Sequence, residues 1–220
     1  MASPDRLPLI ARLLGRTQNM LFRLAQLGPG GRALRETQAT QVPIDFHRWY
    51  AQRILGINGS AYWPMHPSST VSYAKRILIG IETSPGWSPG CMIHGENGIV
   101  IGDYTQISQN VAILSGNHDP YALRRQLPSE PIRIGRYCLL GFNSVILPGV
   151  VLGDFTIVGA NTVVTQSFGE GYVVLGGAPA RILKRLDPRR AEFYRSKHEY
   201  HGYVPASEFP EFAKRHLVVS

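Results

Sequence analysis

The residues of this chain best suited to chemistry gather around one histidine, in the segment GNHDPYALRR. His118 is followed by fifteen residues, 119–133, that contain three prolines and three arginines. An imidazole with an ordinary pKa of about 6.5 can take the proton of a hydroxyl group near neutral pH, which makes that oxygen a nucleophile. His118 is therefore a candidate general base, although an ordinary surface histidine beside a turn would have the same local sequence.

Polar side chains before His118 could assist it. A general base is usually held in one tautomer by an acceptor group. Asp119 is adjacent but would point the other way along an extended strand, so Glu96 is the better candidate, unless it is a solvated carboxylate at a corner.

The residues after His118 could contact the molecule that carries the reacting hydroxyl group, which we call the acceptor. Tyr121 offers an aromatic face on which a sugar ring can stack. Arg124 and Arg125 could bind an acidic or phosphorylated group.

A six-residue period in the aliphatic side chains indicates the elements that position these groups. The period holds in two blocks, and glycine follows four of the six positions in the second block. The positions are Ile101, Ile107 and Ile113, then Ile134, Leu140, Ile146, Leu152, Val158 and Val164. A period of six fits neither an α-helix nor a strand in an ordinary sheet, and it is typical of hexapeptide β-helix repeats. It predicts an all-β core of short strands with the aliphatic side chains inside, and glycines that tolerate the backbone geometry of a corner.

The phase of this repeat breaks between Ile113 and Ile134. The fifteen extra residues are 119–133, and their prolines and arginines predict an excursion that is neither core nor regular strand. Long excursions from a rigid scaffold are commonly functional. His118 stands where the chain leaves the wall.

Composition limits where the chain works. No apolar run approaches the roughly 20 residues that span a bilayer, and the first residues, MASPDRLPLI, lack the pattern of a secretory signal. The two cysteines do not make a disulfide framework, and Cys138 is expected to be a buried, reduced thiol. These features predict a cytoplasmic location.

The net charge of +8 is concentrated at the two ends of the chain. Residues 1–53 have a net charge of +5, residues 54–183 of zero and residues 184–220 of +3. The repeats carry no basic groove studded with aromatic residues, so the sequence does not favour a nucleic-acid partner.

The segments outside the repeats are expected to be partly helical. Residues 7–28 have the pattern of an amphipathic helix with arginines between the apolar positions, and a second helix is expected over about 43–56. The first helix could pack on the repeats or on a neighbouring subunit, or lie on the anionic inner face of a membrane. The tail from Asp187 is expected to be helical and then irregular. We divide the chain into an N-terminal helical extension and cap (1–70), a β-helix domain (71–183) and a C-terminal extension (184–220).

Three motifs, G-N-H-D, I-L-P-G-V and G-G-A-P-A-R in this order, make residues from about 77 to 184 similar to the hexapeptide-repeat acyltransferases. The segment most resembles the galactoside, maltose and xenobiotic O-acetyltransferases and the acetyltransferases of surface-polysaccharide assembly. The resemblance implies a left-handed parallel β-helix, a homotrimer with sites between subunits, and acetyl-CoA as acyl donor, without a metal ion. It also implies that His118 is the general base and that Glu96 contacts the acceptor. The stretch around His94 is similar, one residue out of register, to the one that bears the base of serine acetyltransferases, which makes His94 a second candidate base. His94 and Asn97 could also line the site for the acceptor.

The resemblance places the acyl donor in the groove between two adjacent prisms. The matching positions are Gly141, Phe142, Ala160, Thr165, Gln166, Arg181 and Lys184. A backbone N–H near Gly141 and Phe142 would stabilise the oxyanion, and Arg181 and Lys184 would meet the phosphates. Many relatives have lysine where this chain has Gln166, which removes one expected phosphate contact. Gly141 could equally be a plain corner glycine, and the two cations could be solvated.

The predicted activity is direct transfer of an acetyl group from acetyl-CoA to a hydroxyl of a sugar or another small acceptor. No serine or cysteine is placed as a covalent nucleophile, so no acetyl-enzyme is expected. Three alternatives remain open. A non-catalytic scaffold would use the β-helix only for assembly, and a serine-acetyltransferase-like enzyme would modify an amino acid. A γ-type carbonic anhydrase shares the prism but binds zinc through three histidines, and only His94 and His118 lie in the repeats.

Overall fold

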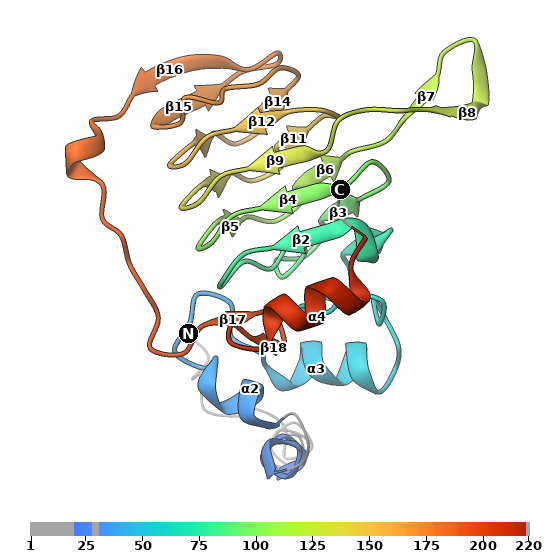
Figure 1. Cartoon of the computed structure of the whole chain (residues 1–220), viewed down its shortest axis with the longest axis vertical. Helices are drawn as coiled ribbons and strands as arrows, with labels where there is room; N and C mark the ends of the chain where they lie inside the picture. The colour runs from blue at the N-terminus through green and yellow to red at the C-terminus, as the bar shows by residue number, and fades with distance from the viewer. Residues whose placement is uncertain (1–19, 28–30, 219–220) are drawn as a thin grey trace, which may run out of the picture.

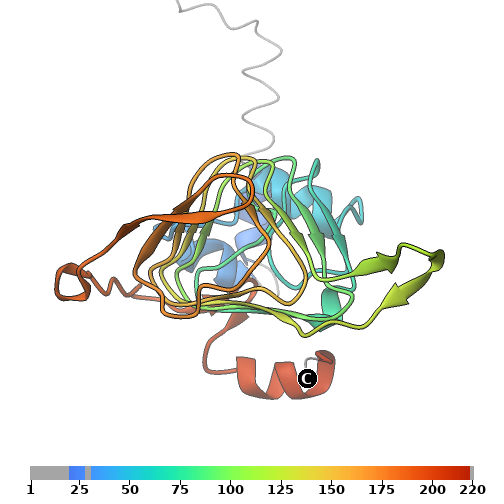
Figure 2. The same ribbon diagram turned by 90° about the horizontal axis from the view of Figure 1, so that it is seen from above.

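The computed structural model describes residues 20–27 and 31–218, so the predicted helix over 7–28 is seen only from residue 20 onwards. Short parallel strands form three faces that wind into a prism of triangular cross-section (Figures 1 and 2). Ile134 pairs with Leu152 and Leu140 with Val158, residues eighteen positions apart. One full coil therefore consists of three hexapeptides, as the period predicts.

The three faces follow one another along the chain in a fixed order. Face 1 contains β1 (Thr70–Ser72), β3 (Met92–His94), β6 (Ala112–Leu114), β11 (Val145–Ile146) and β14 (Val163–Val164). Face 2 contains β2 (Ile77–Ile79), β4 (Ile99–Ile101), β9 (Ile132–Ile134) and β12 (Val151–Leu152). Face 3 contains β5 (Gln106–Ile107), β10 (Leu139–Leu140), β13 (Ile157–Val158), β15 (Val173–Gly176) and the antiparallel edge strand β16 (Arg181–Arg185).

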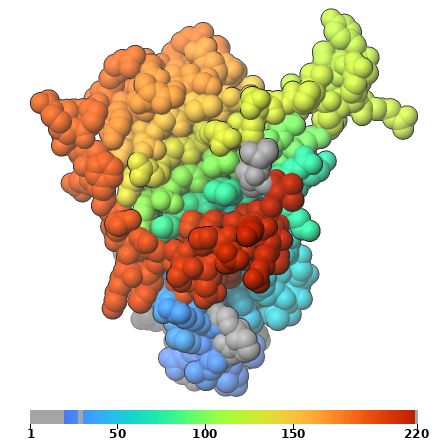
Figure 3. All heavy atoms as spheres, viewed as in Figure 1, coloured from blue at the N-terminus to red at the C-terminus, as the bar shows by residue number. Residues whose placement is uncertain are grey.

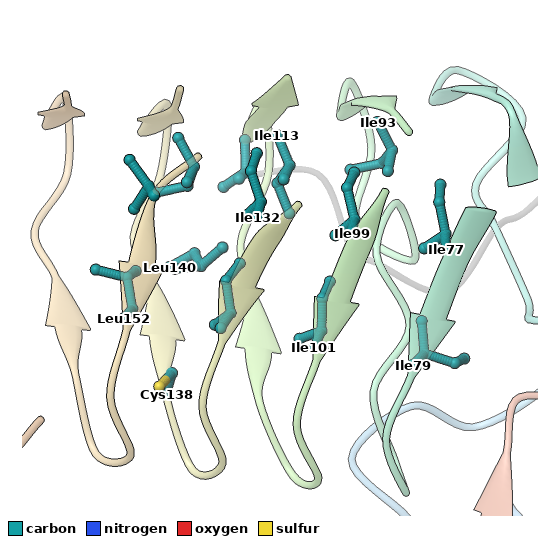
Figure 4. Close-up of a cluster of buried hydrophobic side chains, with 14 of the residues drawn as sticks. Ile77, Ile79, Ile93, Ile99, Ile101, Ile113, Ile132, Cys138, Leu140 and Leu152 are labelled. Carbon is teal, nitrogen blue, oxygen red and sulfur yellow. The ribbon is translucent and has the colours of Figure 1, made fainter. Parts of the chain in front are cut away.

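The in-phase aliphatic side chains fill the interior, as predicted (Figure 4). Eight of the nine are at most 3% exposed, and Ile107 is partly buried against them. Cys138 lies in the same interior, is 2% exposed, and burial raises the pKa of its thiol to about 11. The expectation of a buried, reduced thiol is confirmed, and Cys91 is also free and buried.

The expected reason for the repeat glycines is wrong. Gly135 and Gly141 do not have a positive φ; the left-handed residues lie two positions later, at Tyr137 (φ 54°) and Asn143 (φ 58°). A Cβ on Gly135 would lie 2.5 Å from the backbone nitrogen of Asp154 in the next coil. The glycines are therefore required by the close stacking of the coils.

The left-handed positions stack into columns along two corners. Between faces 2 and 3 the column is aromatic, and between faces 3 and 1 it consists of Asn110, Asn143 and Asn161. The aromatic column runs through Tyr104, Tyr137, Phe155 and Tyr172, with successive ring centroids 5.3, 5.0 and 5.0 Å apart and planes within 16° of parallel. Offset-stacked rings attract one another beyond the area they bury, so this column ties coil to coil.

The excursion is an antiparallel hairpin, with a register shift between His118 and Asp119, that projects from the corner between faces 1 and 2 (Figures 1 and 3). Its strands β7 (Asn117–Asp119) and β8 (Ala122–Leu127) are antiparallel, and His118 lies opposite Gln126. Ile132 is fully buried and pairs with Ile99 on face 2. The expectation that 119–133 is neither strand nor core is therefore wrong, because the alternation of Ile132, Arg133 and Ile134 already belongs to the wall.

Helices lie beneath the first coil. Residues 20–27 are helical, followed by α2 (Gly31–Glu36) and α3 (Phe46–Arg53), which confirms the helix expected over 43–56. Tyr62 and Trp63 are buried and close the end of the prism, whereas Tyr73 is 49% exposed. Among the residues described, no helix is long and apolar enough to cross a membrane.

The C-terminal segment returns from the last coil to the first (Figure 1). The expected order of this tail is wrong: irregular chain comes first, and the helix comes last. A single 3-10 turn at Pro188–Arg190 is followed by extended chain, the hairpin of β17 (Tyr200–His201) and β18 (Val204–Pro205), and α4 (Phe209–His216). Phe193 and Tyr194 pack edge-on against the aromatic column, 5.5 Å from Tyr137 and 5.6 Å from Tyr104. We call residues 187–199 the strap.

Candidate active site

His118 is exposed on β7, and a backbone carbonyl of its own hairpin contacts its ring. Its Nδ1 lies 2.7 Å from the carbonyl oxygen of Leu123. Because a carbonyl can only accept, Nδ1 must carry the proton, and the lone pair of the neutral ring is then on Nε2. The hairpin thus presents an imidazole in the tautomer that a general base needs.

Asp119 does not orient His118. Its carboxylate is bound by Arg125 and accepts from the backbone N–H of Tyr121 at 2.8 Å. The Arg125 guanidinium makes the largest contribution to lowering the pKa of Asp119, and the backbone N–H groups of Tyr121 and Ala122 lower it further. The expectation that Asp119 points away from the histidine is confirmed, and its role is to hold the hairpin turn.

His94 and Glu96 form a second polar group at the root of the hairpin. His94 Nε2 is 3.2 Å from Glu96 Oε2, and the two side chains are 26% and 13% exposed. Tyr73 lies edge-on to the His94 ring, with centroids 5.3 Å apart. In the side-chain orientation that points its amide nitrogen at acceptor atoms, Gln126 donates a hydrogen bond to Glu96 Oε2 at 3.2 Å. Glu96 therefore links the coil to the strand that faces His118, and its observed histidine partner is His94.

Asn97 ties the coil to the base of the hairpin. Its side-chain nitrogen donates to the carbonyl of Ser115 at 2.7 Å and to that of Leu127 at 3.3 Å. Asn97 is a predicted acceptor contact, but its side-chain N–H groups already donate hydrogen bonds within the chain. At the far end of the hairpin, Tyr121 is 97% exposed and Arg124 is also exposed.

The predicted donor positions lie on two corners of the prism. Gly141, Phe142 and Ala160 lie after strands of face 3, whereas Thr165 and Gln166 follow β14 on the corner that carries the hairpin. The Gly141 N–H donates to the carbonyl of Val158 at 2.8 Å. It is therefore not available to an oxyanion, which corrects that part of the prediction.

Arg181 and Lys184 are both exposed on β16 but lie at different places along it. Arg181 pairs with Gly176 near the end of β15, whereas Lys184 pairs with Val174 and lines a cavity with Phe155 and Tyr172. No contact between the described residues joins His118 to any of the seven donor positions.

Sequence reasoning missed Leu123 and Gln126. Both residues reach the site because of the antiparallel register of the hairpin. Gln126 donates to Glu96, and Leu123 contacts His118 through a backbone carbonyl that any residue would supply. The alternating pattern of a half-buried strand could have indicated β8, but all of its side chains are exposed, so no pattern is visible. In the described part of the chain, no three His, Cys, Asp or Glu side chains are placed to hold a metal ion.

The fold and these sequence motifs match known proteins. Residues 131–166 match the family model for the hexapeptide repeat of succinyl-transferases. WcaF of Escherichia coli K12, assigned to colanic acid biosynthesis as an acetyltransferase, is 30% identical over 147 residues, which are 66% of this chain and 80% of WcaF. Galactoside O-acetyltransferase of the same strain is 30% identical over 139 residues, 62% of this chain and 66% of that enzyme.

A solved structure supports the fold alone. The maltose O-acetyltransferase of Clostridium difficile 630 superposes with a TM-score of 0.51 at 21% identity, covering 78% of this chain and 86% of that one. The chain belongs to the hexapeptide-repeat acyltransferases, enzymes built on a left-handed parallel β-helix.

Proposed function

We propose that this enzyme transfers an acetyl group from acetyl-CoA to a hydroxyl of a saccharide or similar small acceptor, with His118 as general base. The observation that carries the proposal is the 2.7 Å contact between His118 Nδ1 and the Leu123 carbonyl, which leaves Nε2 free on an exposed ring. The names of two relatives, a galactoside acetyltransferase and an acetyltransferase assigned to colanic acid biosynthesis, support a saccharide acceptor.

The reaction proceeds by direct transfer. Nε2 of His118 takes the proton of the acceptor hydroxyl as its oxygen attacks the thioester carbonyl. The tetrahedral intermediate collapses to the ester, and the imidazolium returns the proton to the departing thiolate. With the Gly141 N–H already donated, the N–H of Phe142 is the better candidate for the oxyanion. A cysteine nucleophile is disfavoured because burial raises the thiol pKa of both Cys91 and Cys138.

The arrangement favours a homotrimer with sites shared between chains. The hairpin with His118 projects away from the prism (Figure 2). Gly141, Phe142 and Ala160 follow strands of face 3, on another corner of the same chain. A neighbouring chain would then supply the corner with Gly141, Phe142 and Ala160, whereas Thr165 and Gln166 lie on the same corner as the hairpin. Mixed assemblies of His118→Ala and Ala160→Trp chains should regain activity, because some interfaces combine an intact hairpin with an intact corner. No regain of activity would mean that each chain holds a complete site.

A second candidate base is His94, as in a serine-acetyltransferase-like enzyme acting on an amino acid. Its 3.2 Å contact with Glu96 is the observation in its favour. Against it, His94 is less exposed than the His118 ring, and Tyr73 covers its edge. Serine as acceptor should therefore be a poor substrate compared with a saccharide.

A cytoplasmic location with contact to an anionic membrane face is part of the proposal. Leu24 and Leu27 are 54% and 82% exposed on the N-terminal helix, and Arg23 is exposed beside Leu24. An apolar face with arginines suits the surface of an anionic bilayer. Flotation with anionic but not neutral vesicles is the expected result, and flotation with neither would remove this part.

The activity itself is tested by release of free thiol from acetyl-CoA. The purified chain is incubated with sugars, nucleotide-linked sugars, serine and antibiotic alcohols in turn. Thiol release with at least one saccharide, together with an acetylated product, is expected. Release with none of these acceptors would refute the proposed acceptor class.

A further inference from the structure

A cavity of about 620 Å³ lies at the aromatic corner, between the last coil and the start of the strap. It lies at the side of the prism where β16 leads into the strap (orange in Figure 1). Face 3 separates it from the corner that carries Gly141 and Ala160. Tyr172, Lys184, Arg190 and Glu192 are among its lining residues, and only Lys184 has been given a role above.

The aromatic column ends in this cavity. Phe193 and Tyr194 cover Tyr104, Tyr137 and Phe155 edge-on. Tyr172 stacks on Phe155 at 5.0 Å, and no further ring of the described chain stacks on it. Leu186 lies opposite Tyr172 in the next layer, where its backbone N–H donates to the Tyr172 carbonyl at 2.7 Å. A planar ring from a ligand would therefore stack on the part of the Tyr172 ring that lines the cavity.

Two cations at the cavity have no partner within the described residues. Lys184 and Arg190 are exposed and make no ion pair there. Their neighbours differ: Arg189 is bound to Asp187 at 2.8 Å, and Arg185 lies 3.4 Å from Glu170. Unpaired lysine and arginine side chains form strong charged hydrogen bonds with the oxygens of a phosphate group.

Two carboxylates line the cavity. Asp187 is bound to Arg189, and Glu192 fits the same kind of ligand. Glu192 is exposed and forms no ion pair with the described residues, so its carboxylate can accept hydrogen bonds from hydroxyl groups. The cavity thus offers a stacking face, two cations and a hydroxyl acceptor within one space.

We propose that this cavity binds a nucleoside phosphate. The base stacks on Tyr172, the phosphates meet Lys184 and Arg190, and Glu192 accepts from the ribose. Two molecules in the proposed reaction have this chemistry: the nucleotide end of the acyl donor, and a nucleotide-linked saccharide used as acceptor. The choice between these sources rests on the proposed function, whereas the binding itself does not.

Calorimetric titration tests the site directly, with adenosine 3′,5′-bisphosphate and UDP-glucose as probes. At least one probe should bind the native chain. Arg190→Ala should weaken that binding about tenfold, as expected for a lost charged hydrogen bond, and Tyr172→Leu about fivefold, for a lost stack. Arg195→Ala is the matched control, because it removes the same charge from a strap residue that lies outside the lining and 3.7 Å from Glu199. It should weaken binding less than twofold.

Three results would overturn the inference: binding of neither probe at millimolar concentration, an equal loss in Arg195→Ala and Arg190→Ala, or full binding in Tyr172→Leu. If only the bisphosphate binds, and Lys184→Ala raises the KM for acetyl-CoA, the site serves the donor. If only UDP-glucose binds, and that KM is unchanged, it serves the acceptor. Both results support the site. His118→Ala should bind the probe as the native chain does, so failure of acetyl transfer would refute the proposed function and leave this inference standing.

Discussion

Substitution of Gly135 by alanine separates two explanations of the repeat glycines. If glycine were needed for corner geometry, the backbone at Gly135 would be left-handed, and it is not. The added Cβ would instead lie 2.5 Å from Asp154 N and 2.6 Å from the carbonyl carbon of Gly153. The coils would have to separate by about 0.5 Å to reach even a 3.0 Å contact, which side-chain Cβ atoms rarely go below.

The cost follows from the contacts that hold the two coils together. The Gly135 N–H donates to Leu152 at 2.8 Å, and the Arg136 N–H donates to the Asp154 side chain at 2.7 Å. Overpacking of this kind costs about 1–3 kcal/mol, and the lengthened hydrogen bonds add about 1 kcal/mol. Alanine recovers about 0.4–1 kcal/mol by restricting the unfolded chain. A net loss of about 2 kcal/mol is expected, which lowers Tm by about 4–8 °C in a chain of this size.

Urea and thermal unfolding followed by far-ultraviolet circular dichroism measure this loss. Gly169 is the matched control, because a Cβ there meets nothing within 4 Å and its φ is not positive. Gly169→Ala should be as stable as the native chain or slightly more stable. Equal stability of the two variants would refute the stacking explanation.

Three further predictions concern burial and the strap. Cys91 and Cys138 should react with a disulfide reagent at pH 8 only after unfolding, since burial raises the pKa of both thiols; rapid reaction of the native chain would contradict this. Burial raises the pKa of Tyr104 and Tyr200 to about 12, with the Glu36 hydrogen bond adding to the shift at Tyr200. Since an unfolded tyrosine titrates near pH 10, this contribution to stability is complete below pH 10 and declines as the pH rises to 12. The free energy of unfolding should fall over that range, and a constant value would count against the burial. Phe193→Ala removes edge contacts worth about 1–2 kcal/mol, so a protease should cleave the strap faster, and an unchanged cleavage rate would show that the aromatic column does not hold it.

The sequence predicted the prism because its signal is dense. Each coil repeats the same inward aliphatic positions, so Ile134, Leu140 and Ile146 specify the coil length and the interior together. The glycines were located correctly but explained wrongly, because the close approach of the next coil is a tertiary fact. The left-handed positions of Tyr137 and Phe155 were not foreseen, since aromatic residues seldom adopt that backbone geometry.

The site was predicted less completely than the fold. The tautomer of His118 depends on its contact with Leu123 across the hairpin, and the excursion was expected to be irregular. Because all side chains of β8 are exposed, no alternating pattern predicts this strand or the contact between the Leu123 carbonyl and His118. The expectation that the tail would be helical first and irregular later was wrong for a similar reason. Phe193 and Tyr194 pack against the aromatic column, which no local sequence pattern indicates.

The central claim is that the exposed imidazole of the hairpin removes the proton from the acceptor. The most direct measurement is kcat/KM for acetyl transfer by His118→Ala and His94→Ala with the best acceptor. We expect a loss of about 10²–10⁴-fold for His118→Ala and of less than about tenfold for His94→Ala. Activity of His118→Ala within threefold of the native enzyme, or an equal loss in the His94 variant, would contradict the account.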